Sequence, residues 1–199
     1  MRPIQKIQNV SRGILQKWGP TSTRRNLWNT EFANGRWDYI DSTPEDCVYL
    51  FLRKYLRGGS LLDLGCGSGN TGTELETNSY SNYIGVDISD VAIEKAKERS
   101  ARARRARRNR YFQADIVKYV PAVNHDVILF RESLFYVPLA RTRTMLYRYR
   151  KYLKPDGVII VRMCDRDKYS AIIRMIESNF QVVEKHSPIV TTSILVVFR

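Results

Sequence analysis

The chain of 199 residues is poor in cysteine and histidine and contains no long apolar run. Its three cysteines (Cys47, Cys66 and Cys164) are widely spaced and odd in number, so they form neither a disulfide framework nor a zinc-binding pattern. No apolar stretch approaches the roughly 20 residues of a membrane-spanning helix. The first ten residues also lack the apolar core of a secretory signal. We therefore expect no metal site and no transmembrane segment, and a reducing, cytoplasmic location.

Acidic residues are missing from three segments that hold most of the positive charge. The formal net charge is +13. Six basic residues lie within residues 1–30, seven arginines lie between Arg99 and Arg110, and six basic residues lie within residues 139–154. The rest of the chain has 14 basic against 20 acidic residues. The sequence thus predicts a mildly acidic body that carries three basic segments.

From residue 60 onward, short apolar runs alternate with longer amphipathic segments. Continuous apolar runs of this length are typical of strands buried on both faces of a parallel sheet. The alternation predicts an open α/β sheet with right-handed crossovers. Two further strand-like runs near the end have a short connection and should pair antiparallel. The expected strands are residues 60–64, 83–88, 111–116, 126–130, 158–163, 181–186 and 192–199, and the expected helices are 44–57, 90–103, 139–153 and about 167–179.

The first 42 residues show weaker periodicity but contain three tryptophans. We interpret residues 1–42 as an arm that packs on the active edge of a domain formed by residues 43–199. Two smaller expectations concern the amino ends of later strands. Residues 154–157 should form the turn that ends a helix, and His125 should lie at an edge or on the surface.

A glycine-rich loop follows the first expected strand. Gly65 and Gly67 allow a tight turn and a close approach of the backbone to a ligand. Asp63 precedes this loop, Asp87 lies 20 residues after Gly67, and Asp115 follows the third strand. Three acids at the carboxyl ends of neighbouring strands lie at the ligand-binding edge of an open α/β sheet. The loop lacks the spacing of a dinucleotide site and the Lys-Ser/Thr of a triphosphate site.

These residues resemble the class I S-adenosylmethionine-dependent methyltransferases. LLDLGCGSG is similar to their first motif, YIGVDIS to the second, FQADI to the third, HDVILFRES to the fourth and LKPDGVIIV to the fifth. The resemblance covers about residues 44–199. It implies a Rossmann-like, mostly parallel seven-stranded sheet with helices on both faces, of order 3-2-1-4-5-7-6 with strand 7 antiparallel.

The same resemblance implies how S-adenosylmethionine would be held. Asp63 and the backbone of Gly65, Cys66 and Gly67 would face its methionine part. Asp87 would take the ribose hydroxyls and Ile88 the adenine face. Asp115 and the backbone of Ile116 would take the adenine edge. We also assign Arg131 and Trp37 to the cofactor site, with Trp37 in an aromatic segment of the arm that would exclude water.

The acceptor cannot be identified from the cofactor motifs. The fourth strand lacks the Asn/Asp-Pro-Pro-aromatic motif that is typical of enzymes acting on amino groups of nucleic-acid bases. We take Glu132 as the candidate proton acceptor or amine-binding group, the alternative being an ion pair with Arg131. Tyr136 either lines the acceptor pocket or packs in the core.

Three functions remain open at this point. The first is methyl transfer to an oxygen or nitrogen of a small molecule. The second is methylation of RNA or an RNA-associated protein, recruited through the basic arm and the arginines between Arg99 and Arg110. The third is a non-catalytic module that binds the cofactor. Because the helices over 90–103 and 139–153 run away from the ligand edge, we expect Arg148 and most of these arginines on the far side, where a nucleic acid or another anionic partner could bind.

Overall fold

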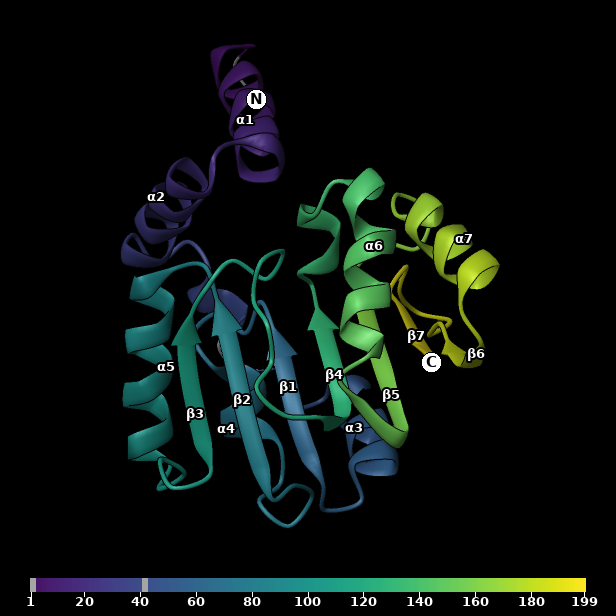
Figure 1. The fold of residues 1–199 in the computed structure, drawn as a ribbon. Coiled ribbons are helices and arrows are strands. Elements are labelled where there is room, and N and C mark those ends of the chain that lie inside the picture. Colours follow the sequence, from purple (N-terminus) through teal and green to yellow (C-terminus); the bar gives the residue numbers. More distant parts are fainter. Residues whose placement is uncertain (1–2, 41–42) are drawn as a thin grey trace.

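The computed structural model describes residues 3–40 and 43–199, with residues 3–10 and 40 described by their backbone alone. Seven strands in these residues form one sheet of order β3-β2-β1-β4-β5-β7-β6 (Figure 1). All pairs are parallel except β5 with β7 and β6 with β7. This confirms the predicted fold. The strands are β1 (Ser60–Leu64), β2 (Asn82–Asp87), β3 (Asn109–Gln113), β4 (His125–Arg131), β5 (Leu153–Met163), β6 (Val182–His186) and β7 (Ile194–Phe198).

Helices cover both faces of the sheet, and one core forms under each layer. One core joins α6 (Leu139–Arg150) and α7 (Ser170–Asn179) to alternate residues of the strands. The other joins α3 (Val48–Leu56) and α5 (Asp90–Arg102) to the residues between them. This alternation explains why the central strands read as continuous apolar runs. Shorter helices are α4 (Asn70–Glu74), η1 (Asp38–Ile40) and η2 (Leu134–Tyr136). In the part of the chain described, no helix is long and apolar enough to span a membrane.

Two expectations at the amino end of β4 were wrong. Residues 154–157 do not form a separate turn, because β5 already begins at Leu153 and its pairing with β4 shifts from His125–Leu153 to Val127–Val158. An added Cβ at Gly157 would lie 2.9 Å from the His125 carbonyl oxygen, so glycine permits this close approach. His125 is fully buried rather than exposed. Burial and nearby Lys154 lower its pKa to about 4, so the imidazole is neutral.

The arm consists of α1 (Pro3–Trp18) and α2 (Thr21–Ala33), which lie above the carboxyl ends of the parallel strands (Figure 1). Both nitrogen contacts of Arg25 with the Asp90 carboxylate measure 2.6 Å. Arg24 forms an ion pair with Asp115, which Thr21 also contacts at 3.2 Å. The predicted division between residues 42 and 43 involves residues 41–42, which are outside the described residues, and it stays a prediction.

The ion pair of Arg24 provides a test of how α2 is held. We expect Arg24→Ala to speed amide hydrogen exchange in α2 about tenfold or more. The reason is that the Asp115 side chain is only 4% exposed, and an unpaired buried group costs about 1–3 kcal/mol. Arg25→Ala is the matched control, because its ion pair lies on the surface and should matter less. Equal acceleration by the two variants would contradict this assignment.

Two arginines of the segment between Arg99 and Arg110 contact the domain itself. Arg105 donates to the carbonyl oxygens of Gly72 and Leu75, and Arg108 donates to that of Thr77 at 2.5 Å. These contacts close the end of α4 and the loop after it. Within the segment from Arg99 to Arg110, part of the charge therefore stabilises the fold.

Candidate functional site

A cavity of about 460 Å³ lies at the carboxyl edge of the sheet, beneath the arm. Its walls come from α1, α2 and η1 and from the loops after β1, β2, β3, β4 and β5. Ten of the twelve residues assigned from the sequence line it: Trp37, Gly65, Gly67, Asp87, Ile88, Asp115, Ile116, Arg131, Glu132 and Tyr136. Their placement is established here, whereas their individual roles stay predictions.

The glycine loop after β1 is hydrogen-bonded to the carboxyl end of β2. The amide groups of Gly65 and Cys66 both donate to the Val86 carbonyl oxygen, at 2.7 and 3.1 Å. Gly65 has a φ of +84°, and a Cβ there would lie 2.3 Å from Cβ of Ser133. Only glycine fits this position, because both the backbone conformation and the contact exclude a side chain. The loop thus presents backbone rather than side chains to the cavity.

The Asp87 carboxylate is held in a fixed orientation by the same loop. One oxygen accepts from the Gly67 amide at 3.0 Å and the other from the Ser89 amide at 2.9 Å. Burial raises the pKa of Asp87, and these amide hydrogen bonds counteract it. An ionised carboxylate retains further lone pairs, so Asp87 can accept hydrogen bonds from hydroxyl groups in the cavity.

Asp63 and Cys66 do not reach the cavity. Asp63 has only 1% of its surface exposed and accepts a hydrogen bond from the Tyr83 hydroxyl at 2.7 Å. Burial raises the pKa of Asp63 to about 6, against the hydrogen bond from Tyr83 and the charge of Arg131. Its strand position explains this, because Asp63 shares the face of β1 that carries Leu61. Asp63 therefore bonds to Tyr83 of β2 inside the core rather than facing the cavity.

At the other end of the cavity, both oxygens of the Asp115 carboxylate accept hydrogen bonds from the protein. One oxygen meets Arg24 and Thr21, and the other accepts from the Val117 amide at 3.0 Å. Arg148 was expected on the far side of the domain, which was wrong. Its guanidinium donates to the carbonyl oxygens of Val117 and Ile116, at 2.6 and 3.1 Å. Arg148 therefore links α6 to the loop after β3.

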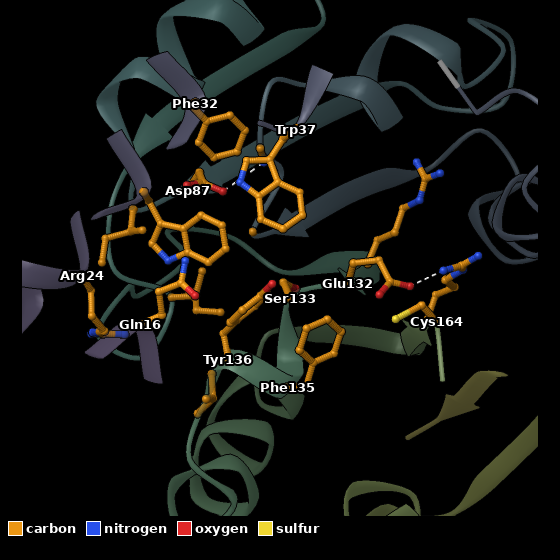
Figure 2. Close-up of a pocket in the computed structure, with 18 of the residues that line it drawn as sticks. Gln16, Arg24, Phe32, Trp37, Asp87, Glu132, Ser133, Phe135, Tyr136 and Cys164 are labelled. Atoms are coloured by element: carbon orange, nitrogen blue, oxygen red, sulfur yellow. Dashed lines mark hydrogen bonds and ion pairs between the residues drawn. The ribbon is translucent and has the colours of Figure 1, made fainter. Parts of the chain in front are cut away.

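Aromatic rings form much of the remaining wall (Figure 2). The ring of Trp28 meets that of Tyr136 edge to face at 4.8 Å, and Phe135 stacks on Tyr169 at 4.3 Å. Glu31, which is buried, binds two groups of this wall. It accepts from the indole of Trp37 and from the amide of Gln16, each at 2.9 Å.

Glu132 lies at the end of β4, on the opposite side of the cavity from Arg24 (Figure 2). Its φ of +54° is unusual for a residue other than glycine and turns the chain away from the strand. The alternative, an ion pair with Arg131, was wrong, because the Glu132 carboxylate pairs with Arg162. Arg131 instead donates to Asp46 at 2.9 Å and to the Tyr49 hydroxyl at 2.9 Å.

The family follows from a comparison with known proteins. A family model described as "Methyltransferase domain" matches residues 56–193. The chain belongs to the class I S-adenosylmethionine-dependent methyltransferases. It is 29% identical over 119 residues to 27-O-demethylrifamycin SV methyltransferase of Amycolatopsis mediterranei (strain S699). That alignment covers 56% of this chain and 44% of the relative, so the chain matches less than half of that protein.

Solved structures of other methyltransferases share the fold. N-methyltransferase NodS from Bradyrhizobium japonicum WM9, in complex with S-adenosyl-L-homocysteine, has a TM-score of 0.70 at 19% identity. The match covers 88% of this chain and 97% of NodS. Magnesium protoporphyrin IX methyltransferase from Synechocystis PCC 6803, with bound S-adenosylhomocysteine, has a TM-score of 0.70 at 16% identity, over 90% of this chain and 99% of that one.

S-adenosylmethionine, the cofactor of this methyltransferase family, fits the residues of the cavity. Its ribose hydroxyls need an acceptor, and the Asp87 carboxylate, which backbone amides hold in place, lines the cavity. A Cβ at Gly67 would come within 3.4 Å of the Phe32 ring, so this part of the cavity is kept open by the missing side chain. The cavity volume lies within the range of small-molecule sites.

Sequence reasoning missed several residues of this methyltransferase cavity, namely Gln16, Arg24, Phe135, Arg162, Cys164 and Tyr169. Those of the arm (Gln16 and Arg24) could not be found because no local pattern reports which face of α1 or α2 meets the cavity. Phe135 and Tyr169 lie after strand ends, so their place in the chain was a usable signal. Burial and the Glu132 charge raise the pKa of Cys164 to about 11, which keeps its thiol protonated.

Proposed function

We propose that this protein transfers the methyl group of S-adenosylmethionine to an oxygen or nitrogen of a small, largely apolar molecule. The aromatic wall of the cavity is the observation that carries this proposal, because planar apolar side chains bind apolar molecules and exclude water. The names of two similar proteins cover both kinds of acceptor atom, since one is an N-methyltransferase and the other is named for a 27-O-demethyl compound.

In this proposal, residues at the strand ends would hold the cofactor. Asp87 would accept from the ribose hydroxyls, Ile88 would contact the adenine face, and Asp115 and the backbone of Ile116 would bind the adenine edge. The backbone of Gly65 and Gly67 would leave room for the methionine part. When bound, the cofactor supplies an activated methyl group that leaves by in-line displacement, and the protein aligns the acceptor with it.

Tyr136 and Glu132 have different chemistry at the acceptor end. Burial raises the pKa of Tyr136, so its hydroxyl stays protonated and can donate a hydrogen bond or form part of the wall. The Glu132 side chain is 30% exposed and has a carboxylate oxygen beyond the one bonded to Arg162. We therefore assign Glu132 as the group that takes the acceptor's proton, with Arg162 holding it in place.

Replacing Glu132 with glutamine tests this assignment. Because the amide cannot take a proton, we expect turnover to fall about 100-fold, at the lower end of the range for general bases. The dissociation constant for S-adenosylhomocysteine should stay within about threefold. Glu184→Gln is the control, since Glu184 pairs with Lys54 on the surface away from the cavity. Unchanged turnover in Glu132→Gln would exclude the proton-transfer role.

Calorimetric titration tests the proposed activity itself. Micromolar binding of S-adenosylmethionine and S-adenosylhomocysteine is expected, followed by release of S-adenosylhomocysteine with one of a set of apolar phenols, amines and carboxylic acids. Binding without release for any acceptor would favour the non-catalytic module. Salt-dependent RNA binding together with RNA methylation would favour the RNA enzyme. Absence of cofactor binding would overturn the proposal.

A further inference from the structure

The outer face of α1 exposes three large apolar side chains in its last two turns. Ile14 is 55% exposed, Leu15 43% and Trp18 61%. The opposite face of the same turns packs against α2. Gln16 donates to Glu31 at 2.9 Å, and Arg12 pairs with Glu31 at 3.2 Å. The helix is thus anchored by one face and leaves an apolar face on the outside, which is uncommon for a surface helix.

The position of this helix makes its exposed face the outermost part of the carboxyl edge. Figure 1 shows α1 projecting beyond α2, away from the sheet. Gln16, on the inward face, also lines the cavity. A surface that touched Ile14, Leu15 and Trp18 would therefore lie next to the cavity.

The charged residues of α1 itself have one sign. The sequence of α1 contains Lys6, Arg12 and Lys17 and no acidic residue. At the same edge, Arg141 and Arg143 are exposed in the first turns of α6. A helix that has tryptophan and aliphatic residues on one face and cations beside them is typical of helices that lie in the interface of an anionic membrane.

We propose that α1 docks the carboxyl edge of this protein on an anionic phospholipid surface, with Ile14, Leu15 and Trp18 entering the interface. A second copy of the chain fits this face less well. Pairing two copies of α1 would bring their cations together with no acid in either helix to neutralise them. An anionic bilayer supplies both the apolar layer and the opposite charge. Docking would place the cavity at the lipid surface, where an apolar acceptor would be concentrated.

Vesicle binding by the full-length protein, without cofactor, tests this surface independently of methyl transfer. We expect the wild type to sediment with vesicles of phosphatidylcholine and phosphatidylglycerol, and much less with phosphatidylcholine alone. Added salt should weaken the binding because it screens the charges. Trp18→Glu should lower the partition coefficient about tenfold or more. It removes the aromatic ring that would enter the lipid interface, and it adds a negative charge that the anionic lipids repel.

Leu50→Glu is the matched control. Leu50 lies on α3 and is also 61% exposed, so the substitution makes the same change of charge at a site of equal exposure. Its partition coefficient should stay within about twofold of the wild type. Ile14→Ser is a second variant without added charge, and circular dichroism checks that each variant is folded. No vesicle binding by the wild type, or equal losses in Trp18→Glu and Leu50→Glu, would overturn the proposal. So would a wild-type dimer that Trp18→Glu dissociates in the absence of lipid, because the partner would then be a second copy.

Discussion

Replacing Asp46 with alanine is expected to lower the free energy of unfolding by about 3–5 kcal/mol, because it removes the carboxylate that pairs with the buried Arg131 guanidinium. The Asp46 side chain is 7% exposed and accepts from Arg131 at 2.9 Å. Arg162 approaches the same oxygen at 3.3 Å, and the Val48 amide donates to the other at 3.0 Å. Arg131 and Arg162 are direct neighbours on β4 and β5. Without the carboxylate, two like charges would face each other inside the protein.

The stabilisation by Asp46 should also depend on pH. Burial alone would raise its pKa, but the charges of Arg131 and Arg162 and the Val48 amide outweigh burial and lower it. A lowered pKa means that the folded state holds the proton less tightly than the unfolded state does. The contribution is therefore present above the unfolded pKa of about 3.9, and it is lost as the pH falls through the folded value.

Urea unfolding at neutral pH and through the acid range measures both effects. Asp167→Ala is the control, since the Asp167 side chain is 75% exposed and pairs with Arg166 at the surface, where such a pair contributes little. A loss below about 1 kcal/mol in Asp46→Ala would mean that Arg131 and Arg162 do not need this carboxylate.

The second large effect concerns cofactor affinity. Asp87→Ala should weaken S-adenosylhomocysteine binding by about 1.5–3 kcal/mol, or roughly 10- to 150-fold, because two hydroxyl groups would lose a charged acceptor. The carboxylate is held by the Gly67 and Ser89 amides, so the loop itself also loses support. Calorimetry gives the dissociation constants directly.

A nearby acid provides the control for this measurement. Asp90 lies three residues after Asp87, but it pairs with Arg25 on the surface and does not line the cavity. Asp90→Ala should leave the dissociation constant within about threefold. If Asp87→Ala bound S-adenosylhomocysteine as tightly as the wild type, Asp87 would not hold the ribose.

The sheet could be predicted because its signals are local. Continuous apolar runs mark the central strands, and the glycine loop marks the end of β1. Asp87 and Glu132 reach the cavity because each lies at or beside the carboxyl end of a parallel strand. The same rule holds for Asp115, although β3 ends two residues earlier, at Gln113.

The rest of the site depends on contacts that no local pattern encodes. Residues 94 apart meet where Thr21 contacts Asp115, and only the packing of α2 decides this. Asp63 shows the opposite case. Its motif implied a contact with the cofactor, whereas the alternation of β1 side chains directs it into the core that holds Leu61 and Tyr83. Arg162 was missed because it lies within an apolar strand sequence. It is nevertheless the cation that pairs with Glu132.

The contact between Arg24 and Asp115 joins the arm to the cavity through a single carboxylate. A ligand group that displaced Arg24 from this oxygen would loosen α2, and by thermodynamic reciprocity any change that held α2 more firmly would weaken that ligand by the same factor. Ligand affinity at this end of the cavity and the attachment of α2 are then linked by one coupling free energy. A substitution on the outer surface of α2 would change the ligand's dissociation constant through this coupling, although it does not contact the ligand.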